Sequence, residues 1–314
     1  MTEWSPHHDP LAELQFALAE GDAQRPPTGL GRTVLDAALA ARVAGRPVDE
    51  PAPIPPDEAF RRAVTSLDSL LGSLDPEEWA QGTVRGLDVQ QLVGHLTGVE
   101  RDFQAGLDAP DGAQADADHV ASTDPVAAAQ VGRPPSETHD EWRAETAETV
   151  DALAGVATSP ARLGDVIALH GLRMPLGPLL VVRTFELWTH EEDIRRATSR
   201  PLQAPDAASL RLMTDLAITM LPAGLRRIER SGDGRSARIV LTGSGGGTWQ
   251  TGLGATSAGS RHEGPADVRI VVDAVDFCRL VANRMDPVAL ESIVTGDGTL
   301  AHDLLTGAAS LALD

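Results

Sequence analysis

Residues Val181–Ala197 read VVRTFELWTHEEDIRRA, a largely apolar segment that carries Glu186 and His190 four positions apart. On a helix these two side chains lie one turn apart on the same stripe. A helix that is apolar on nearly all sides is normally buried, and a buried carboxylate is costly without a partner. A divalent metal ion would satisfy both side chains, so the segment predicts a metal site. The alternative is a solvated helix surface, where such pairs are common.

A catalytic zinc site uses three protein ligands and leaves one position open, so a third ligand is needed. His95, in LVGHLTGV, is the other histidine on a strongly apolar helical face. We therefore predict that His95, Glu186 and His190 form a His–His–Glu set. The set suits zinc, and nickel, iron or manganese could also use it. A core histidine that is simply hydrogen-bonded is the competing interpretation of His95.

Two neighbours on the same segment could support this set. Asp193 lies one turn beyond His190 and could orient its imidazole, and Arg183 could pair with Glu186. The segment is not the zinc-protease signature, because Ile194 stands where the second histidine of that signature belongs. A metalloprotease is therefore excluded.

Helical spacing predicts four amphipathic helices, with a long polar loop between the second and the third. Asp88 is a good N-cap for the second helix. The expected helices cover 56–74, 89–107, 137–156 and the residues from 175 onward, and the loop covers 108–125. This pattern is typical of a four-helix bundle, which we assign to residues 57–200.

After residue 200 the pattern changes to short strands and helices. Helices are expected at 206–222 and 299–313, strands at 237–243, 248–254 and 291–297, and a strand running into a helix at 266–284. Strands and helices that do not alternate strictly predict a small α+β domain, residues 201–314. Residues 1–56 read as a Pro-rich, weakly structured extension. The predicted fold class is multidomain, α and α+β.

Charge and composition narrow the possible partners. The formal net charge is −20, all 26 basic residues are arginine, and no stretch forms a basic face, so neither nucleic acid nor an anionic membrane is expected as a partner. The single cysteine, Cys278, allows no internal disulfide and indicates a reducing compartment. No apolar run approaches the roughly 20 residues of a membrane span, and no signal-peptide pattern is present. A cytoplasmic location is expected, and the oligomeric state is left open.

Three stretches resemble the mycothiol-dependent maleylpyruvate isomerase family. LDVQQLVGHLTGVERDF is similar to the family's second-helix motif, and RTFELWTHEEDIRRA to its E-x-x-x-H-x-x-D segment. ADVRIVVDAVDFCRLVANRMDP with VTGDGTLAHDLL is similar to its smaller, sterol-carrier-like domain. The resemblance covers roughly residues 57 to 310 and implies a DinB-like bundle. In that bundle His95, Glu186 and His190 would hold a divalent metal ion, usually zinc.

The resemblance also implies a low-molecular-weight thiol, mycothiol, as cosubstrate, with its sulfur at the open metal position. The thiolate is the reactive form, and a metal ion lowers the pKa of a thiol well below its free value of about 8.5. Such a thiolate could isomerise or S-conjugate a small electrophile, which would make the chain an isomerase or a transferase. The alternative is a non-catalytic ligand-binding or regulatory protein on the same scaffold, which the N-terminal extension favours.

Three further residues lie outside the metal set. Arg284 aligns with a family arginine that is thought to hold a substrate carboxylate, although Asn283 stands where the family usually has glycine. A bidentate grip would suit that role, and an ordinary surface arginine is the alternative. Cys278 lies among apolar neighbours and reads as a core residue, hence a poor nucleophile. His170 precedes the fourth helix and could lie at the mouth of the site, but it reads as a loop histidine without a role.

Overall fold

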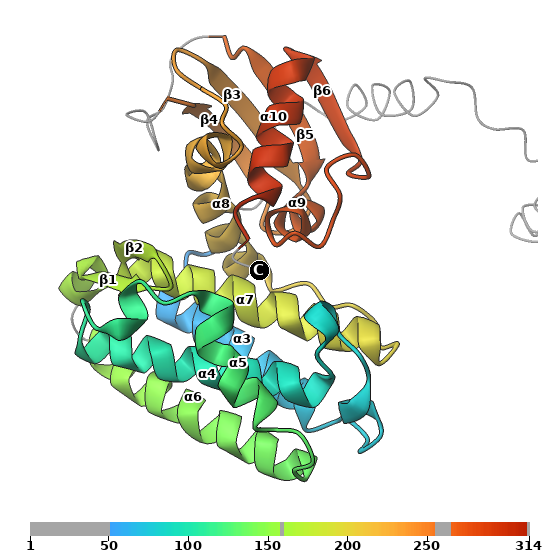
Figure 1. Ribbon diagram of the computed structural model, residues 1–314. Coiled ribbons are helices and arrows are strands. Elements are labelled where there is room, and N and C mark those ends of the chain that lie inside the picture. The colour runs from blue at the N-terminus through green and yellow to red at the C-terminus, as the bar shows by residue number, and fades with distance from the viewer. Residues whose placement is uncertain (1–50, 158–159, 255–264, 313–314) are drawn as a thin grey trace, which may run out of the picture. The chain divides into compact units, whose positions relative to one another are not determined.

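The computed structural model describes residues 51–157, 160–254 and 265–312. These residues form a helical part and a part that contains the larger of two sheets (Figure 1). The expected Pro-rich extension, residues 1–56, falls almost entirely outside the described residues and stays a prediction. The division at residue 200 also stays a prediction.

The first part is helical, with one small hairpin. Helix α3 packs against α7, and α4 packs against both α5 and α6. The helices are α3 (Pro56–Leu71), α4 (Val89–Asp108), α5 (His119–Ala128), α6 (Pro135–Ala157) and α7 (Leu176–Ala197), and strands β1 (Val166–Leu169) and β2 (Leu172–Pro175) form the hairpin before α7. These elements include the four helices expected from the spacing.

Helix α4 begins as the sequence predicts. Asp88 accepts a hydrogen bond from the Gln91 backbone N–H (2.7 Å), and the Gln91 side chain accepts one from the Asp88 N–H (3.1 Å). This reciprocal capping box satisfies two backbone donors that a helix start leaves open. Further along, a Cβ atom at Gly98 would lie 3.1 Å from Thr123 of α5. The glycine therefore lets α5 approach α4 closely, beside His95.

The expected loop at 108–125 is corrected by the structure, because α5 begins inside it at His119. Asp118 caps this helix by accepting from the Ala121 N–H (2.9 Å). Pro125 lies inside the helix, and proline is normally evidence against helix interiors. Helix α5 also lacks a clear apolar stripe, so periodicity gave no signal. Its stability comes from packing against α4, which the local sequence does not encode.

The hairpin β1–β2 was not predicted either. Its two-residue turn consists of His170 (φ 50°) and Gly171 (φ 75°), both in the left-handed region. Such turns match the twist of the flanking strands, and glycine adopts the second position without strain. The turn places the imidazole of His170 in the protein interior.

Within the described residues, the C-terminal part is a four-stranded mixed sheet with three helices. Strand order is β4-β3-β5-β6, with β3 and β5 parallel and the outer pairs antiparallel. Its elements are α8 (Ala207–Arg227), β3 (Ser236–Thr242), β4 (Gly247–Gly252), β5 (Val268–Asp273), α9 (Ala274–Val281), β6 (Ser292–Gly296) and α10 (Gly298–Ala309). Buried and more exposed residues alternate along β3 and β5, as expected for a sheet with one covered face. The predicted fold class, α together with α+β, is confirmed.

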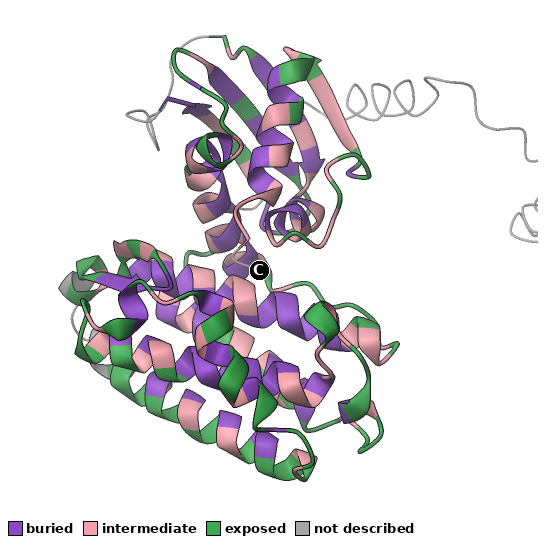
Figure 2. Cartoon of the chain, in the orientation of Figure 1, coloured by how far each residue is buried: buried purple, intermediate pink, exposed green. Residues whose placement is uncertain are grey.

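Helix α7 contributes to both hydrophobic cores, and most of its residues are buried (Figure 2). Leu179 and Leu187 belong to the core formed with α3 and α4. Val181 and Trp188 belong to the core formed with α8, α9 and the sheet. A helix covered on opposite faces must be apolar on both, and its polar side chains then need partners inside the protein. Among the described residues, no helix is both long and apolar enough to cross a membrane.

Candidate metal centre and cavity

The structure brings His95 of α4 together with Glu186 and His190 of α7. One ligand atom from each residue lies within 4.8 Å of the other two, and His95 Nε2 is 3.7 Å from Glu186 Oε1. Both histidines are buried, and the Glu186 side chain is 13% exposed. The solvated helix surface considered for Glu186 and His190 is therefore not what the structure shows.

The imidazoles of His95 and His190 are each hydrogen-bonded through Nδ1, so that Nε2 faces the cluster. Thr123 Oγ1 donates to the His119 carbonyl oxygen (2.9 Å), so it accepts from the Nδ1–H of His95 (2.7 Å). Asp193 Oδ2 lies 3.0 Å from His190 Nδ1 and accepts from it in the same way. A carboxylate or hydroxyl on one ring nitrogen fixes the tautomer that presents a lone pair on the other.

Two buried atoms of the cluster have no hydrogen-bond partner within the described part of the chain. They are His95 Nε2 and Glu186 Oε1, which face each other across 3.7 Å. Buried polar atoms are nearly always satisfied, and an unsatisfied one costs about 1–3 kcal/mol. A divalent cation would accept the lone pairs of both atoms, so the residues present fit a metal ion.

Arg183 neutralises the carboxylate of Glu186. Its guanidinium is fully buried and contacts both Glu186 and Glu100, and Glu100 also accepts from Thr149 Oγ1 (3.0 Å). Burial alone would raise the pKa of Glu186, but Arg183 and the nearby histidines outweigh it and lower that pKa to about 2. One guanidinium cannot neutralise two buried carboxylates, and the complete burial of Glu100 raises its pKa. The lowered pKa of Glu186 keeps its carboxylate ionised at neutral pH, so it is available as a ligand.

His95 is held in its neutral form. Burial, followed by the proximity of His190, lowers the pKa of His95 to about 2. A neutral imidazole is the form that binds metal ions, so His95 needs no deprotonation at neutral pH.

Sequence reasoning missed His119 beside the cluster and gave its neighbour His170 no role. His119 Nε2 lies 3.5 Å from Glu186 Oε1, and His119 Nδ1 lies 2.9 Å from His170 Nδ1. His170 Nε2 is in turn 2.9 Å from Asp102 Oδ2. His170 lies in the β1–β2 turn, as expected for a loop histidine, but its imidazole is buried and contacts His119 and Asp102. The one available signal was Asp118 directly before His119, a helix cap in a stretch that otherwise reads as loop.

Asp193 connects the cluster to Arg284. The Arg284 guanidinium binds the Asp193 carboxylate through Nε and Nη2, both at 2.9 Å. Asn283, just before it, has a φ of 54°, a left-handed conformation that asparagine tolerates better than most residues. The substitution for the family's glycine is therefore compatible with the backbone. The expected grip of Arg284 on a substrate carboxylate stays a prediction.

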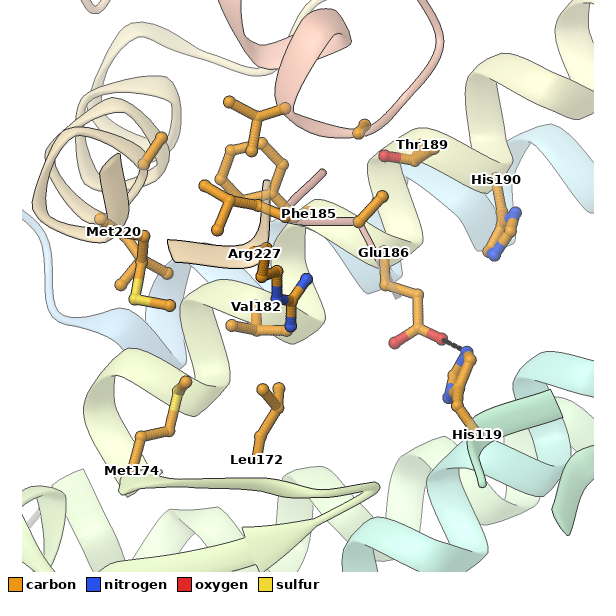
Figure 3. Close-up of a pocket in the computed structure, with 16 residues that line it drawn as sticks. His119, Leu172, Met174, Val182, Phe185, Glu186, Thr189, His190, Met220 and Arg227 are labelled. Carbon is orange, nitrogen blue, oxygen red and sulfur yellow. Dashed lines mark ion pairs between the residues drawn. The ribbon is translucent and has the colours of Figure 1, made fainter. Parts of the chain in front are cut away.

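A cavity opens beside Glu186 and His190 (Figure 3). It encloses about 830 Å³ of space, including the part that is open to solvent. His119 meets the Glu186 carboxylate at this wall, and most of the remaining wall is apolar, whereas Arg284 does not line the cavity. The apolar lining residues are Leu172, Met174, Val182, Phe185, Leu216, Ala217, Met220, Val281, Ala282, Leu311 and Ala312, and the polar ones are His119, Glu186, Thr189, His190 and Arg227.

Cys278 takes no part in this cavity. It is fully buried in the core around the sheet, and burial raises the pKa of its thiol. A thiol that stays protonated is a poor nucleophile. The structure thus gives Cys278 the core position expected from its apolar neighbours.

The fold and the cluster define a helical-bundle protein with a candidate metal centre and an attached α+β sheet. Residues 60–195 match the family model described as the mycothiol maleylpyruvate isomerase N-terminal domain. The resemblance of the helix motifs to this family is thus confirmed over residues 60–195.

Two solved structures are similar to the chain. One is a crystal structure of the mycothiol-dependent maleylpyruvate isomerase, with 15% identity and a TM-score of 0.50, covering 76% of this chain and 93% of that one. The other is a histidine-to-alanine mutant of the same enzyme, with 14% identity and a TM-score of 0.49 over the same shares. At this identity the first likeness shows the fold alone. No curated protein sequence matches the chain.

Proposed function

We propose that this chain is a metal-dependent enzyme that uses mycothiol to isomerise or S-conjugate a small electrophile. The observation that carries the proposal is the pair of unsatisfied buried atoms, His95 Nε2 and Glu186 Oε1, beside an open cavity. His190 completes the proposed ligand set. The family supports the thiol, since it is named for mycothiol and for the isomerisation of maleylpyruvate.

The proposed roles follow from the contacts of each residue. His95, Glu186 and His190 would hold a divalent ion, zinc being the best match for two imidazoles and a carboxylate. When bound, such an ion lowers the pKa of a thiol and so supplies thiolate at neutral pH. Arg183 keeps Glu186 ionised, and Asp193 keeps His190 in the tautomer that presents Nε2.

The cavity determines which kind of electrophile can react with the thiolate. Its apolar wall would exclude water from the sulfur and hold the body of an electrophile with a conjugated double bond. Addition of the sulfur to that double bond leaves a single bond that can rotate. Expulsion of the thiol then gives the isomer, whereas protonation of the adduct carbon and retention of the sulfur give the conjugate. Isomerase and transferase thus share the first step.

A binding protein on the same scaffold is the second candidate. The apolar cavity would suit a ligand without turnover, and the matched family segment, 60–195, leaves the first 59 residues outside it. Such a protein would have no need of a thiol. The two candidates therefore differ in whether mycothiol is bound and consumed.

The test begins with the metal content of the purified wild type, His95→Ala and His302→Ala proteins. His302 is an exposed histidine on α10 and serves as the control. We expect one metal ion per chain in the wild type and the control, and a loss in His95→Ala. Mycothiol is then added with a panel of unsaturated keto acids, and both thiol and isomers are quantified. A wild type that binds no metal, or that turns over no substrate with mycothiol, would rule out the proposed enzymatic function.

A further inference from the structure

Arg227 is the one arginine among the residues that line the cavity in the described part of the chain. It lies at the end of α8 and is exposed, so it stands at the opening of the cavity. Its Nη1 atom donates to the Ser310 carbonyl oxygen (2.6 Å), which fixes the position of the guanidinium. Figure 3 shows the side chain among the cavity residues.

The guanidinium of Arg227 lies within ion-pair distance of no carboxylate of the described residues, although the chain has 46 acidic and 26 basic residues. The two other arginines close to the cluster are occupied. Arg183 contacts Glu100 and Glu186, and Arg284 binds Asp193 with two nitrogen atoms. Arg227 therefore offers the guanidinium donors that a carboxylate entering the cavity can use.

The rest of the cavity wall determines how polar the body of a bound ligand can be. This wall is dominated by apolar residues such as Val182, Phe185 and Met220. A ligand with several charged groups would lose hydration there without compensation, whereas a hydrocarbon or aromatic body gains from burial. An anionic ligand must also overcome a net charge of −20, which requires a local cation.

We infer that Arg227 binds the carboxylate of a substrate that has one carboxylate and an apolar body. The carboxylate rests on Arg227 at the opening, and the apolar body extends toward Glu186 and His190. That this ligand is a substrate rests on the proposed function, whereas its binding to Arg227 requires neither metal nor turnover.

Hexanoate and hexanamide are the probes, because they share a body and differ in charge. Their dissociation constants are measured by NMR titration of the full-length wild type, Arg227→Gln and Arg226→Gln at 50 mM salt. Arg226 is the adjacent exposed arginine, does not line the cavity and serves as the matched control. A charged hydrogen bond at an exposed opening is partly screened, so we expect Arg227→Gln to weaken hexanoate by about fivefold to tenfold. Hexanamide should change less than about twofold in either variant.

Salt gives a second readout. Raising the salt to 500 mM should weaken hexanoate binding to the wild type and to Arg226→Gln, and should leave Arg227→Gln nearly unchanged, because screening acts on an exposed charge. The metal content of each sample is measured alongside. Equal hexanoate affinity in the wild type and Arg227→Gln would overturn the inference. A loss of hexanoate affinity in Arg284→Gln alone would also overturn it, because carboxylate binding would then belong to Arg284. A wild type without metal that still shows the Arg227 effect would refute the proposed function only.

Discussion

Replacing Arg183 by methionine should destabilise the protein strongly, because it leaves two carboxylates without their cation. Arg183 is fully buried, and so is its partner Glu100, while Glu186 is 13% exposed. Removing one member of a buried ion pair typically costs roughly 3–5 kcal/mol, since the other charge stays buried. Arg183 is the largest of the causes that lower the pKa of Glu186 against the effect of burial.

The same substitution should change how metal binding depends on pH. Without Arg183 the largest opposition to the burial of Glu186 is lost, so its pKa should rise. A protonated carboxylate is not a metal ligand, and metal affinity at pH 6 should then fall relative to pH 8. In the wild type Glu186 is ionised at both values, and it contributes no such difference.

Urea unfolding at pH 7 measures the loss of stability, and the double variant Arg183→Met/Glu100→Gln tests its cause. Removing the Glu100 charge should recover part of the loss, because one buried carboxylate then remains instead of two. Arg143→Met is the control, since Arg143 pairs with Asp68 but is 53% exposed and should cost less than about 1 kcal/mol. A loss below about 1 kcal/mol in Arg183→Met, or no recovery in the double variant, would refute the reasoning.

Three more predictions concern the same site. In the metal-free protein the pKa of His95 is lowered to about 2, so below pH 6.5 the unfolded chain binds a proton that the folded chain does not. The free energy of unfolding should therefore fall by about 2 kcal/mol from pH 7 to pH 5. Urea titrations of His95→Ala should lack this part of the pH dependence. Asp193→Asn should weaken metal affinity by about 10- to 100-fold in competition with a chromogenic chelator, because His190 loses the carboxylate that orients it. Cys278→Ala should leave mycothiol-dependent turnover within about twofold, and its abolition would mean that the protein's own thiol reacts.

Much of the fold could be predicted because its signals are local. The 3.6-residue spacing of α3, α4 and α7 and the cap at Asp88 depend on residues only a few positions apart. Helix α5 and the β1–β2 hairpin could not be predicted in this way. The first contains Pro125 and has no clear stripe, and the second depends on two left-handed turn residues, His170 and Gly171.

The sequence alone determined that Glu186 and His190 share one stripe of a buried helix, because a four-residue spacing sets that geometry within a single element. The sequence also pointed to His95, but only the tertiary structure decided that it and the other partners meet them. His95 and His119 approach from α4 and α5, and Arg183 reaches Glu100 across 83 residues of chain. The partners of a buried charge are chosen by how helices pack, because packing brings together side chains whose separation in sequence carries no information about their distance in space.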